Sequence, residues 1–209
     1  MKKEKISRPV IGRLPQYYSC VEELYLSNCI RVSSATLSRR LGFTASQIRQ
    51  DFSCFGEFGQ QGYGYNVEEL RAEIGHILGV DNDHHLIMIG VGNLGRALLN
   101  NFPFESSGFT VDASFDVDAD IINTAINGVP VYSVNDLEQY IKRHTIDVVV
   151  LTVPQSVAQD MAARLISLGI KGFWNFTNVE LSSSEPDVKF ENIHFADSLL
   201  TLSYRIANR

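Results

Sequence analysis

The chain has 209 residues, of which 44% are apolar and 20% are charged, the composition of an ordinary globular protein. No run of eighteen apolar residues occurs, so the sequence predicts no membrane span. The polar residues 1–5 lack the apolar stretch of a signal peptide. We therefore expect a cytoplasmic protein.

Positive charge is concentrated at the N-terminal end of the chain. The whole chain carries −6, but residues 1–50 contain nine bases and three acids, a balance of +6 that leaves −12 for the remainder. We call the basic N-terminal part of the chain, which includes residues 1–50, the head. This charge distribution predicts that only the head binds a polyanion such as DNA. A chance asymmetry of the solvated surface is the alternative.

The cysteines Cys20, Cys29 and Cys54 are odd in number, and their spacing fits neither a disulfide framework nor a zinc site. This pattern is typical of a reducing compartment, and we expect no metal site. We expect all three to be small buried apolar residues. A redox-reactive thiol is the alternative.

The first helices follow a helix-turn-helix order. Apolar residues recur at helical spacing over residues 14–27. Ser33 and Ser34 offer an N-cap for a short helix over residues 35–41, and Gly42 stops it. Thr44 and Gln47 form a capping-box pattern that predicts a third helix over residues 45–54.

A glycine-rich segment follows the third helix. Residues 55–65 hold four glycines interleaved with aromatic residues, which favours a β-hairpin, the wing of a winged helix. Asn66 and Glu69 then cap a further amphipathic helix. Because residues 79–85 are polar and turn-rich, we place a winged-helix DNA-binding domain at residues 1–80.

The second half alternates predicted strands and helices. The expected strands are 86–89, 111–115, 148–151 and 172–176, and the expected helices are 93–101, 135–144 and 156–168. This alternation predicts an α/β fold, a Rossmann-type domain with a parallel sheet over residues 81–195. Residues 196–209 predict an amphipathic helix that needs a surface to cover.

A glycine motif stands between the first of these strands and its helix, in the order Gly90, Val91, Gly92, Asn93, Leu94, Gly95. In this context the G-x-G-x-x-G pattern predicts a dinucleotide site. The first glycine permits the turn, the second lets the backbone approach the pyrophosphate, and the third lets the helix pack closely. The helix N-terminus favours the phosphate charge.

Three further groups of residues follow strands of the predicted sheet. Asp116 ends the second strand, where a carboxylate binds ribose hydroxyls and favours NAD(H) over NADP(H). A solvated strand-end acid is the alternative. The other candidates for cofactor contact are Thr152, Val153 and Pro154 after one strand, and Asn175 and Phe176 at another. For the last two, strand-end capping and core packing are the alternative.

The basic head supplies the candidate DNA contacts. Ser46, Gln47, Arg49 and Gln50 lie early on the third helix, where Gln pairs with adenine and Arg with guanine in the major groove. Residues suited to phosphates are Ser33, Arg39 and Arg40. Residues of the wing, expected to reach a minor groove, are Gln60, Gln61 and Tyr63. An ordinary exposed helix face is the alternative.

The motifs together resemble the Rex family of redox-sensing repressors over nearly the whole chain. The resemblance rests on residues 13–18 (RLPQYY), 44–51 (TASQIRQD), 55–67 (FGEFGQQGYGYNV), 90–97 (GVGNLGRA), 151–154 (LTVP) and 169–172 (GIKG). It implies a DNA-binding repressor that senses the NADH/NAD⁺ balance. It also implies a homodimer that exchanges C-terminal helices and binds a palindromic operator.

In such a protein NADH rotates the subunits and releases the operator, while NAD⁺ competes without forcing release. The resemblance also implies an Arg, a Tyr and an Asp that link the subunits around the cofactor. Arg13 and Asp197 match the first and third of these. Asn101 stands where the family has the Tyr.

Two other functions are compatible with the sequence. A small NAD-dependent dehydrogenase is one, but the roughly 130 residues beyond the head leave no room for a typical substrate domain. His194 is its only plausible acid-base residue. A repressor that binds another nucleotide, such as coenzyme A, is the second, although Asp116 argues against a phosphorylated ribose.

Overall fold

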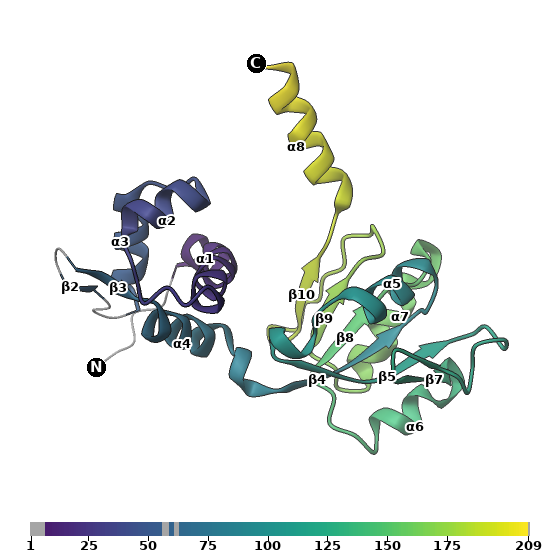
Figure 1. The fold of residues 1–209 in the computed structure, drawn as a ribbon. Helices are drawn as coiled ribbons and strands as arrows, with labels where there is room; N and C mark the ends of the chain where they lie inside the picture. Colours follow the sequence, from purple (N-terminus) through teal and green to yellow (C-terminus); the bar gives the residue numbers. More distant parts are fainter. Residues whose placement is uncertain (1–6, 56–58, 61–62, 209) are drawn as a thin grey trace. The chain divides into compact units, whose positions relative to one another are not determined.

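The computed structural model describes residues 7–55, 59–60 and 63–208, and it divides the chain into two compact units that meet between Asn82 and Asp83 (Figure 1). The division lies two residues beyond the expected boundary at residue 80. Along the described part of the chain, none of the helices has both the length and the apolar character needed to cross a bilayer.

The first unit has the element order of a winged helix, as predicted. Its elements are α1 (Arg8–Leu26), β1 (Arg31–Val32), α2 (Ser34–Leu41), α3 (Ala45–Ser53), β2 (Gly59–Gln60), β3 (Gly64–Asn66) and α4 (Val67–Leu78). The three short strands form an antiparallel sheet in the order β1-β3-β2.

The predicted helix caps of this unit are present. The Thr44 hydroxyl accepts the N–H of Gln47 at 3.1 Å, and the Asn66 side chain accepts the N–H groups of Glu68 and Glu69. The start of α1 was predicted too late, at residue 14. The helix begins at Arg8 because a proline is well tolerated in the first turn, where its missing N–H has no helical partner.

A buried ion pair ties α1 to α3 inside the first unit. Arg13 donates from Nε and Nη2 to the two carboxylate oxygens of Asp51, at 2.7 and 2.8 Å. The Tyr17 hydroxyl donates to the same carboxylate at 2.6 Å, and Asp51 is only 3% exposed. Because Asp51 lies on α3, this network fixes that helix against the core.

Burial acts to raise the pKa of Asp51, but the hydrogen bonds from Arg13 and Tyr17 outweigh it and hold the pKa below its ordinary value. The pKa of Tyr17 is raised, first by burial and then by its bond to Asp51. The network therefore keeps the carboxylate charged in the folded head.

The second unit contains a seven-stranded sheet in the order β10-β9-β8-β4-β5-β7-β6. Its strands are β4 (His84–Ile89), β5 (Phe109–Asp116), β6 (Ala125–Ile126), β7 (Val129–Ser133), β8 (Val148–Leu151), β9 (Gly172–Asn175) and β10 (Lys189–Asn192). All neighbouring strands are parallel except β6 and β7. Numbered along the chain, the six parallel strands have the spatial order 3-2-1-4-5-6 of a Rossmann fold.

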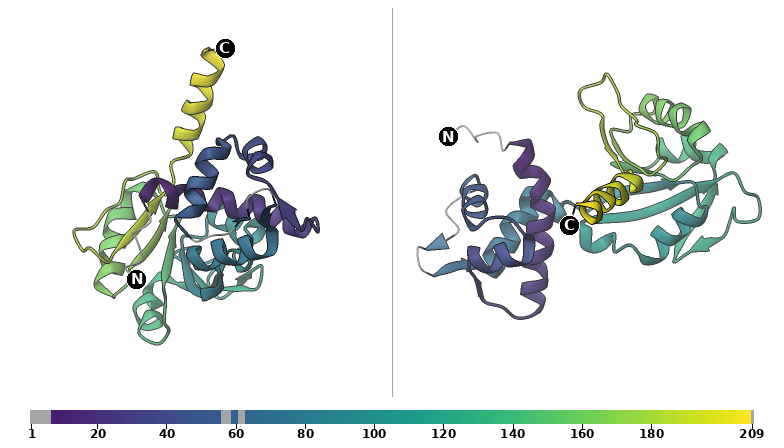
Figure 2. Two further views of the ribbon diagram at one scale, coloured as in Figure 1. Left: turned by 90° about the vertical axis from the view of Figure 1, so that its left-hand side faces the viewer. Right: turned by 90° about the horizontal axis from the view of Figure 1, so that it is seen from above.

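Helices cover both faces of this sheet. They are α5 (Asn93–Asn101), α6 (Leu137–Ile141) and α7 (Gln155–Ser167), whereas α8 (Phe195–Ala207) follows β10 and extends away from the sheet (Figure 1). Single 3₁₀ turns lie at Glu105–Ser107 and Val134–Asp136, and another, Val80–Asn82, ends the first unit. One apolar core packs α6 and α7 on one face, and a second packs α5 on the other. Figure 2 shows α5 and α7 on opposite sides of the sheet.

In the second unit the strands β6, β7 and β10 were not predicted, and α6 is shorter than expected. β7 was missed because it contains Pro130, a residue that favours loops over strands. The proline is tolerated because β7 lies near the edge of the sheet. β10 is an edge strand with an exposed Lys189 and Glu191, so it lacks the apolar run of a buried strand. The predicted helix 135–144 is split into a 3₁₀ turn and one short α-helix.

The final helix, α8, buries none of its residues 195–207. Its large apolar side chains lie more than half exposed, and they are Phe195, Leu199, Leu200, Leu202, Tyr204 and Ile206. At 100° per residue they fall on both sides of the helix, so one covering surface would leave part of them in water.

The Asp51 network generates a stability prediction. Replacing Asp51 by Asn leaves the Arg13 charge without its partner, and we expect a loss of about 3 kcal/mol in the free energy of unfolding near pH 7. Because the folded pKa is depressed, the contribution of the charge is fully present above the unfolded value of about 3.9 and is lost as pH falls below it. Urea unfolding of both proteins from pH 7 to pH 3 measures this difference.

The matched control is Glu23→Gln, which removes a mostly exposed partner of Arg40 at 3.6 Å. We expect a change of less than about 0.5 kcal/mol for that variant. Equal losses of unfolding free energy in the two variants would contradict the stabilising role of the Asp51 charge. A difference between wild type and Asp51→Asn that does not shrink in acid would contradict it as well.

Candidate nucleotide site and nucleic-acid interface

Three glycines shape the turn after β4, each for its own reason. Gly90 has a φ of +93°, and a Cβ on it would lie 2.8 Å from the carbonyl oxygen of Thr152. A Cβ on Gly95 would collide with the carbonyl oxygen of Gly90, so α5 approaches the turn more closely than any other residue permits. A Cβ on Gly92 would meet none of the described atoms within 4 Å, its chain neighbours aside. The backbone at Gly92 is therefore open to a ligand.

Gly92 is also the N-cap of α5 and has no side chain with which to cap it. The N–H groups of the first helical turn point toward the open space above the turn, and the helix dipole adds partial positive charge there. Asn93 is exposed and Leu94 is half-buried beside them. This arrangement suits a phosphate or pyrophosphate group.

Asp116 ends β5 beside the glycine turn. Its carboxylate accepts the N–H of Val91 and also the N–H groups of Val117, at 2.7 Å, and Asp118, at 3.0 Å. A carboxylate has about four acceptor positions, so about one remains for a ribose hydroxyl. The sequence thus predicted the position of the acid, while its bond to the turn appears only in the structure.

The loop after β8 supports the same turn. β8 lies next to β4, where the strand order reverses, and the crevice at that point is the usual ligand site of such sheets. The Thr152 hydroxyl donates to the carbonyl of Gly90 at 2.6 Å. Val153 packs against the core, and the exposed Pro154 is the N-cap of α7. Thr152 therefore positions the glycine turn.

The side chain of Asn175 is hydrogen-bonded within the chain. Its amide nitrogen donates to the Val179 carbonyl and to Asn192, both at 2.7 Å, and its oxygen accepts from the N–H and hydroxyl of Thr177. These bonds fit the alternative of strand-end capping, and a contact of Asn175 with the cofactor stays a prediction. Phe176 is 7% exposed and packs between Trp174 and Phe195.

Arg96 is a residue that the motif-based reading missed. It lies one position beyond the last motif glycine, is exposed, and donates from Nε to the carbonyl of Val91 at 3.0 Å. A guanidinium held beside a helix N-terminus is suited to a phosphate. Its position in the first turns of α5 is the signal that would have identified it.

The early turns of α3 present the predicted base contacts. Ser46, Arg49 and Gln50 are exposed, and Gln47 is half-buried. Arg49 donates from Nη1 to the Ser34 hydroxyl at 3.1 Å, which links α3 to α2. The exposed face of α3 therefore carries two long side chains suited to base edges.

The predicted phosphate contacts lie on and before α2. Ser33 caps α2 by accepting the N–H of Thr36 at 3.1 Å, so its hydroxyl is already used within the head. Arg39 and Arg40 are exposed in the last turn of α2. Arg40 pairs loosely with Glu23 at 3.6 Å, a contact that a phosphate can replace.

Tyr63 is the wing residue for which the structure gives contacts. It is 69% exposed, and Arg31 of β1 lies 6.0 Å from its ring centre and donates to its carbonyl at 3.5 Å. Arg31 was not among the predicted contacts, and it adds a positive charge beneath the wing. Gln61 lies outside the described residues, and for Gln60 only the backbone is described, in β2.

The predicted switch residues have different surroundings. Arg13 is paired with Asp51 inside its own unit, and its role in linking the subunits stays a prediction. Asn101 is exposed at the end of α5 and donates to the Ala97 carbonyl at 2.8 Å. Asp197 is exposed in the first turn of α8.

The cysteines are only partly as predicted. Cys20 is 6% exposed, and burial raises the pKa of its thiol. Cys29 is half-buried, but Cys54 is exposed, because it stands at the C-cap of α3 rather than inside the helix. Among the residues that the structure covers, no three His, Cys, Asp or Glu side chains gather as a metal site requires.

The glycine geometry predicts a division of effects between two alanine variants. Gly92→Ala adds a methyl group to open space, so we expect less than about 1 kcal/mol of lost stability. Dinucleotide affinity should nevertheless fall about tenfold or more, because the backbone is obstructed. Gly95→Ala drives a methyl group into the Gly90 carbonyl and should cost about 1–3 kcal/mol of stability.

Thermal unfolding and calorimetric titration of both variants check this division. Each variant is the control for the other, since the two substitutions are chemically identical and lie three residues apart. A Gly92→Ala variant that binds the dinucleotide as wild type does would show that the ligand does not approach this backbone.

Comparison with known proteins separates the chain into the same two parts. A family model described as "Putative DNA-binding protein N-terminus" matches residues 5–53. A family model described as "CoA binding domain" matches residues 81–179.

Full-length relatives span both parts. The Rex redox-sensing transcriptional repressor of Caldanaerobacter subterraneus subsp. tengcongensis is 47% identical over 205 residues, covering 98% of this chain and 91% of the relative. The Rex repressor of Clostridium botulinum is 47% identical over 202 residues, covering 97% of this chain and 96% of the relative.

Solved structures of a Rex-family repressor, RSP, are similar over 98% of this chain. The structure titled as the repressor alone matches with a TM-score of 0.88 and 44% identity, over 95% of its own length. RSP with β-NAD⁺ and operator DNA matches at 0.89 and 46%, over 94% of its length. RSP with β-NADH matches at 0.89 and 43%, over 96% of its length. The chain belongs to the Rex family of redox-sensing transcriptional repressors.

Proposed function

We propose that this protein is a transcriptional repressor that senses the NADH/NAD⁺ balance and releases operator DNA when NADH binds. The observation that carries the proposal is the open glycine turn at Gly92, with Asp116 beside it, in a chain that also contains a winged helix. Two related structures support it, because RSP was solved with β-NADH in one case and with β-NAD⁺ and operator DNA in another.

The residues present fit a dinucleotide. The first turn of α5, with Arg96 nearby, is suited to the pyrophosphate, and Asp116 has an acceptor position left for a ribose hydroxyl. The negative charge of Asp116 disfavours a 2′-phosphate, which supports NAD(H) over NADP(H). Thr152 holds the turn, and Phe176 supplies an apolar surface near the end of β9.

The first unit is the proposed operator-binding domain. Arg49 and Gln50 would read base edges in the major groove, and Arg39 and Arg40 would bind phosphates. Arg31 and Tyr63 would contribute from the wing. Two such heads on a palindromic operator require half-sites about 34 Å apart, since the recognition helices must follow the groove repeat.

The homodimer is supported by α8. Its exposed apolar side chains lie on both sides of the helix, which is typical of a helix buried between two surfaces. We propose that the second copy of the chain covers it, with the two α8 helices exchanged between subunits. In this division residues 1–80 bind DNA, 81–195 bind NAD(H), and 196–209 join the subunits.

The protein acts as a regulator and not as an enzyme, and we place it in the cytoplasm, where its DNA and cofactor are present. His194, the one acid-base candidate of the dehydrogenase hypothesis, bonds to Glu180 at 2.9 Å in the segment before α8. A coenzyme A-responsive repressor is the second candidate, since the matching family model carries that description. The charge of Asp116 disfavours it.

A gel-shift experiment at fixed salt tests the proposed function. NADH should weaken operator binding by roughly 5- to 150-fold, the usual scale of allosteric coupling, while NAD⁺, NADPH and coenzyme A should have little effect. A response to coenzyme A alone would favour the second candidate. No operator binding, or equal effects from all four compounds, would overturn the proposal.

Two variants locate the effects in that experiment. Asp116→Ala should weaken NADH binding by about tenfold, since the charged acceptor is lost, and should leave cofactor-free operator affinity within about threefold. Arg49→Ala should do the reverse, with a loss of about 1–3 kcal/mol in operator binding. Circular dichroism confirms that both remain folded.

The exposed face of α8 generates a prediction about assembly. Leu199→Asp combined with Leu202→Asp places two charges in the proposed interface, and we expect the dimer to dissociate at micromolar concentration. Sedimentation velocity measures the mass. The control is Thr201→Asp, which adds a charge to the same helix away from these two leucines and should keep the dimer.

Wild type that sediments as a monomer would contradict the proposed assembly directly. A double aspartate variant that remains a dimer would show that another surface joins the subunits.

A further inference from the structure

A continuous row of aromatic side chains runs from the end of α5 to the start of α8. The ring centres of Phe102 and Trp174 are 5.0 Å apart, those of Trp174 and Phe176 are 4.6 Å apart, and those of Phe176 and Phe195 are 6.0 Å apart. Phe104 packs against both Phe102 and Trp174, at 4.8 and 6.3 Å. We call Phe102, Trp174, Phe176 and Phe195 the aromatic row.

The two ends of the row belong to functionally different elements. Phe102 is the C-cap of α5, and the N-terminus of that helix, at Gly92, is the proposed phosphate site. Phe195 is the first residue of α8, the proposed dimer helix. Because a nine-residue helix is a stiff body, a shift at its phosphate end is carried to Phe102.

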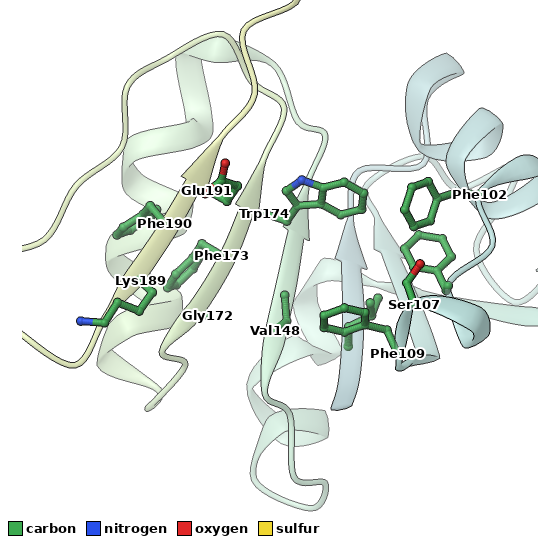
Figure 3. A pocket seen from close by; sticks show the side chains of 12 residues that line it. Phe102, Ser107, Phe109, Val148, Gly172, Phe173, Trp174, Lys189, Phe190 and Glu191 are labelled. Atoms are coloured by element: carbon green, nitrogen blue, oxygen red, sulfur yellow. The ribbon is translucent and has the colours of Figure 1, made fainter. Parts of the chain in front are cut away.

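Trp174 occupies the middle of the row and has room to move. Because side chains alternate along a strand, Trp174 and its neighbour Phe173 pack in different cores. Phe173 packs in the core on the α7 side, where its ring centre lies 4.6 Å from that of Phe190. Trp174 is half-buried and lines an apolar pocket of about 380 Å³, with its indole directed toward Phe102 (Figure 3). A side chain in close contact on two sides and open on a third can take more than one packed position.

We propose that Trp174 is a positioning residue that couples the nucleotide site to α8 through the aromatic row. The inference rests on the proposed function and deepens it, because it names the contacts through which cofactor binding reaches the subunit interface. Edge-to-face packing of Trp174 on both neighbours means that a displacement of Phe102 changes the position of Phe176 and therefore of Phe195.

The test measures a coupling factor, defined as the operator Kd at saturating NADH divided by the operator Kd without NADH. A route through contacts is established only by such coupling and not by adjacency. Trp174→Leu should reduce the factor by about tenfold or to unity, within the 5- to 150-fold range available. NADH affinity of the DNA-free protein and operator affinity of the NADH-free protein should each change by less than about threefold.

Three further variants make the result specific. Trp174→Phe keeps an aromatic ring between the neighbours and should restore most of the factor. Phe102→Leu breaks the row one contact earlier and should reduce the coupling factor as Trp174→Leu does. It replaces Trp174→Leu in the test if that variant does not fold. The matched control is Phe190→Leu, which lines the same pocket outside the row and should leave the factor unchanged.

A Trp174→Leu protein whose coupling factor equals that of wild type would overturn the inference, as would an equal reduction by Phe190→Leu. These outcomes leave the proposed function intact, because wild type still responds to NADH. A wild-type factor of one would overturn the proposed function itself, and the inference with it.

Discussion

The close contact between α5 and the turn after β4 is the constraint on which the rest of the second unit depends. Gly95 lies against the carbonyl of Gly90, and any larger residue would push the helix away from the sheet. At this distance the N-terminus of α5 stands over the carboxyl ends of the strands, beside Asp116 and Thr152. The same helix ends at Asn101 and is followed by its C-cap Phe102, so one rigid element connects the proposed phosphate site with the aromatic row.

The head depends on a different interaction, the buried carboxylate of Asp51. Its bonds to Arg13 and Tyr17 hold α3 against α1, so the exposed face of α3 rests on a rigid support. Arg49 and Gln50, the side chains proposed to read base edges, remain exposed on that face. The two units thus fix their functional surfaces independently, and α8, with its uncovered apolar side chains, is the element suited to join them across a dimer.

The sequence predicted those features that depend on local chemistry. The caps at Thr44 and Asn66, the glycine turn and the strand-end position of Asp116 follow from backbone geometry and helix dipoles, which short motifs encode. The sequence could not show which distant residues a polar side chain bonds to in the folded chain. Only the structure shows that Arg13 bonds to Asp51, 38 residues away, and that Asn175 bonds to Asn192, 17 residues away.

The central claim is that NADH and operator DNA favour different states of one dimer, and binding linkage tests it most directly. NADH is titrated into the free protein and into the protein saturated with operator, with Trp174 fluorescence or calorimetry as the readout. Linkage requires NADH to bind the operator complex more weakly, by the same factor by which NADH weakens operator binding. Equal NADH affinities in the two titrations would contradict the account.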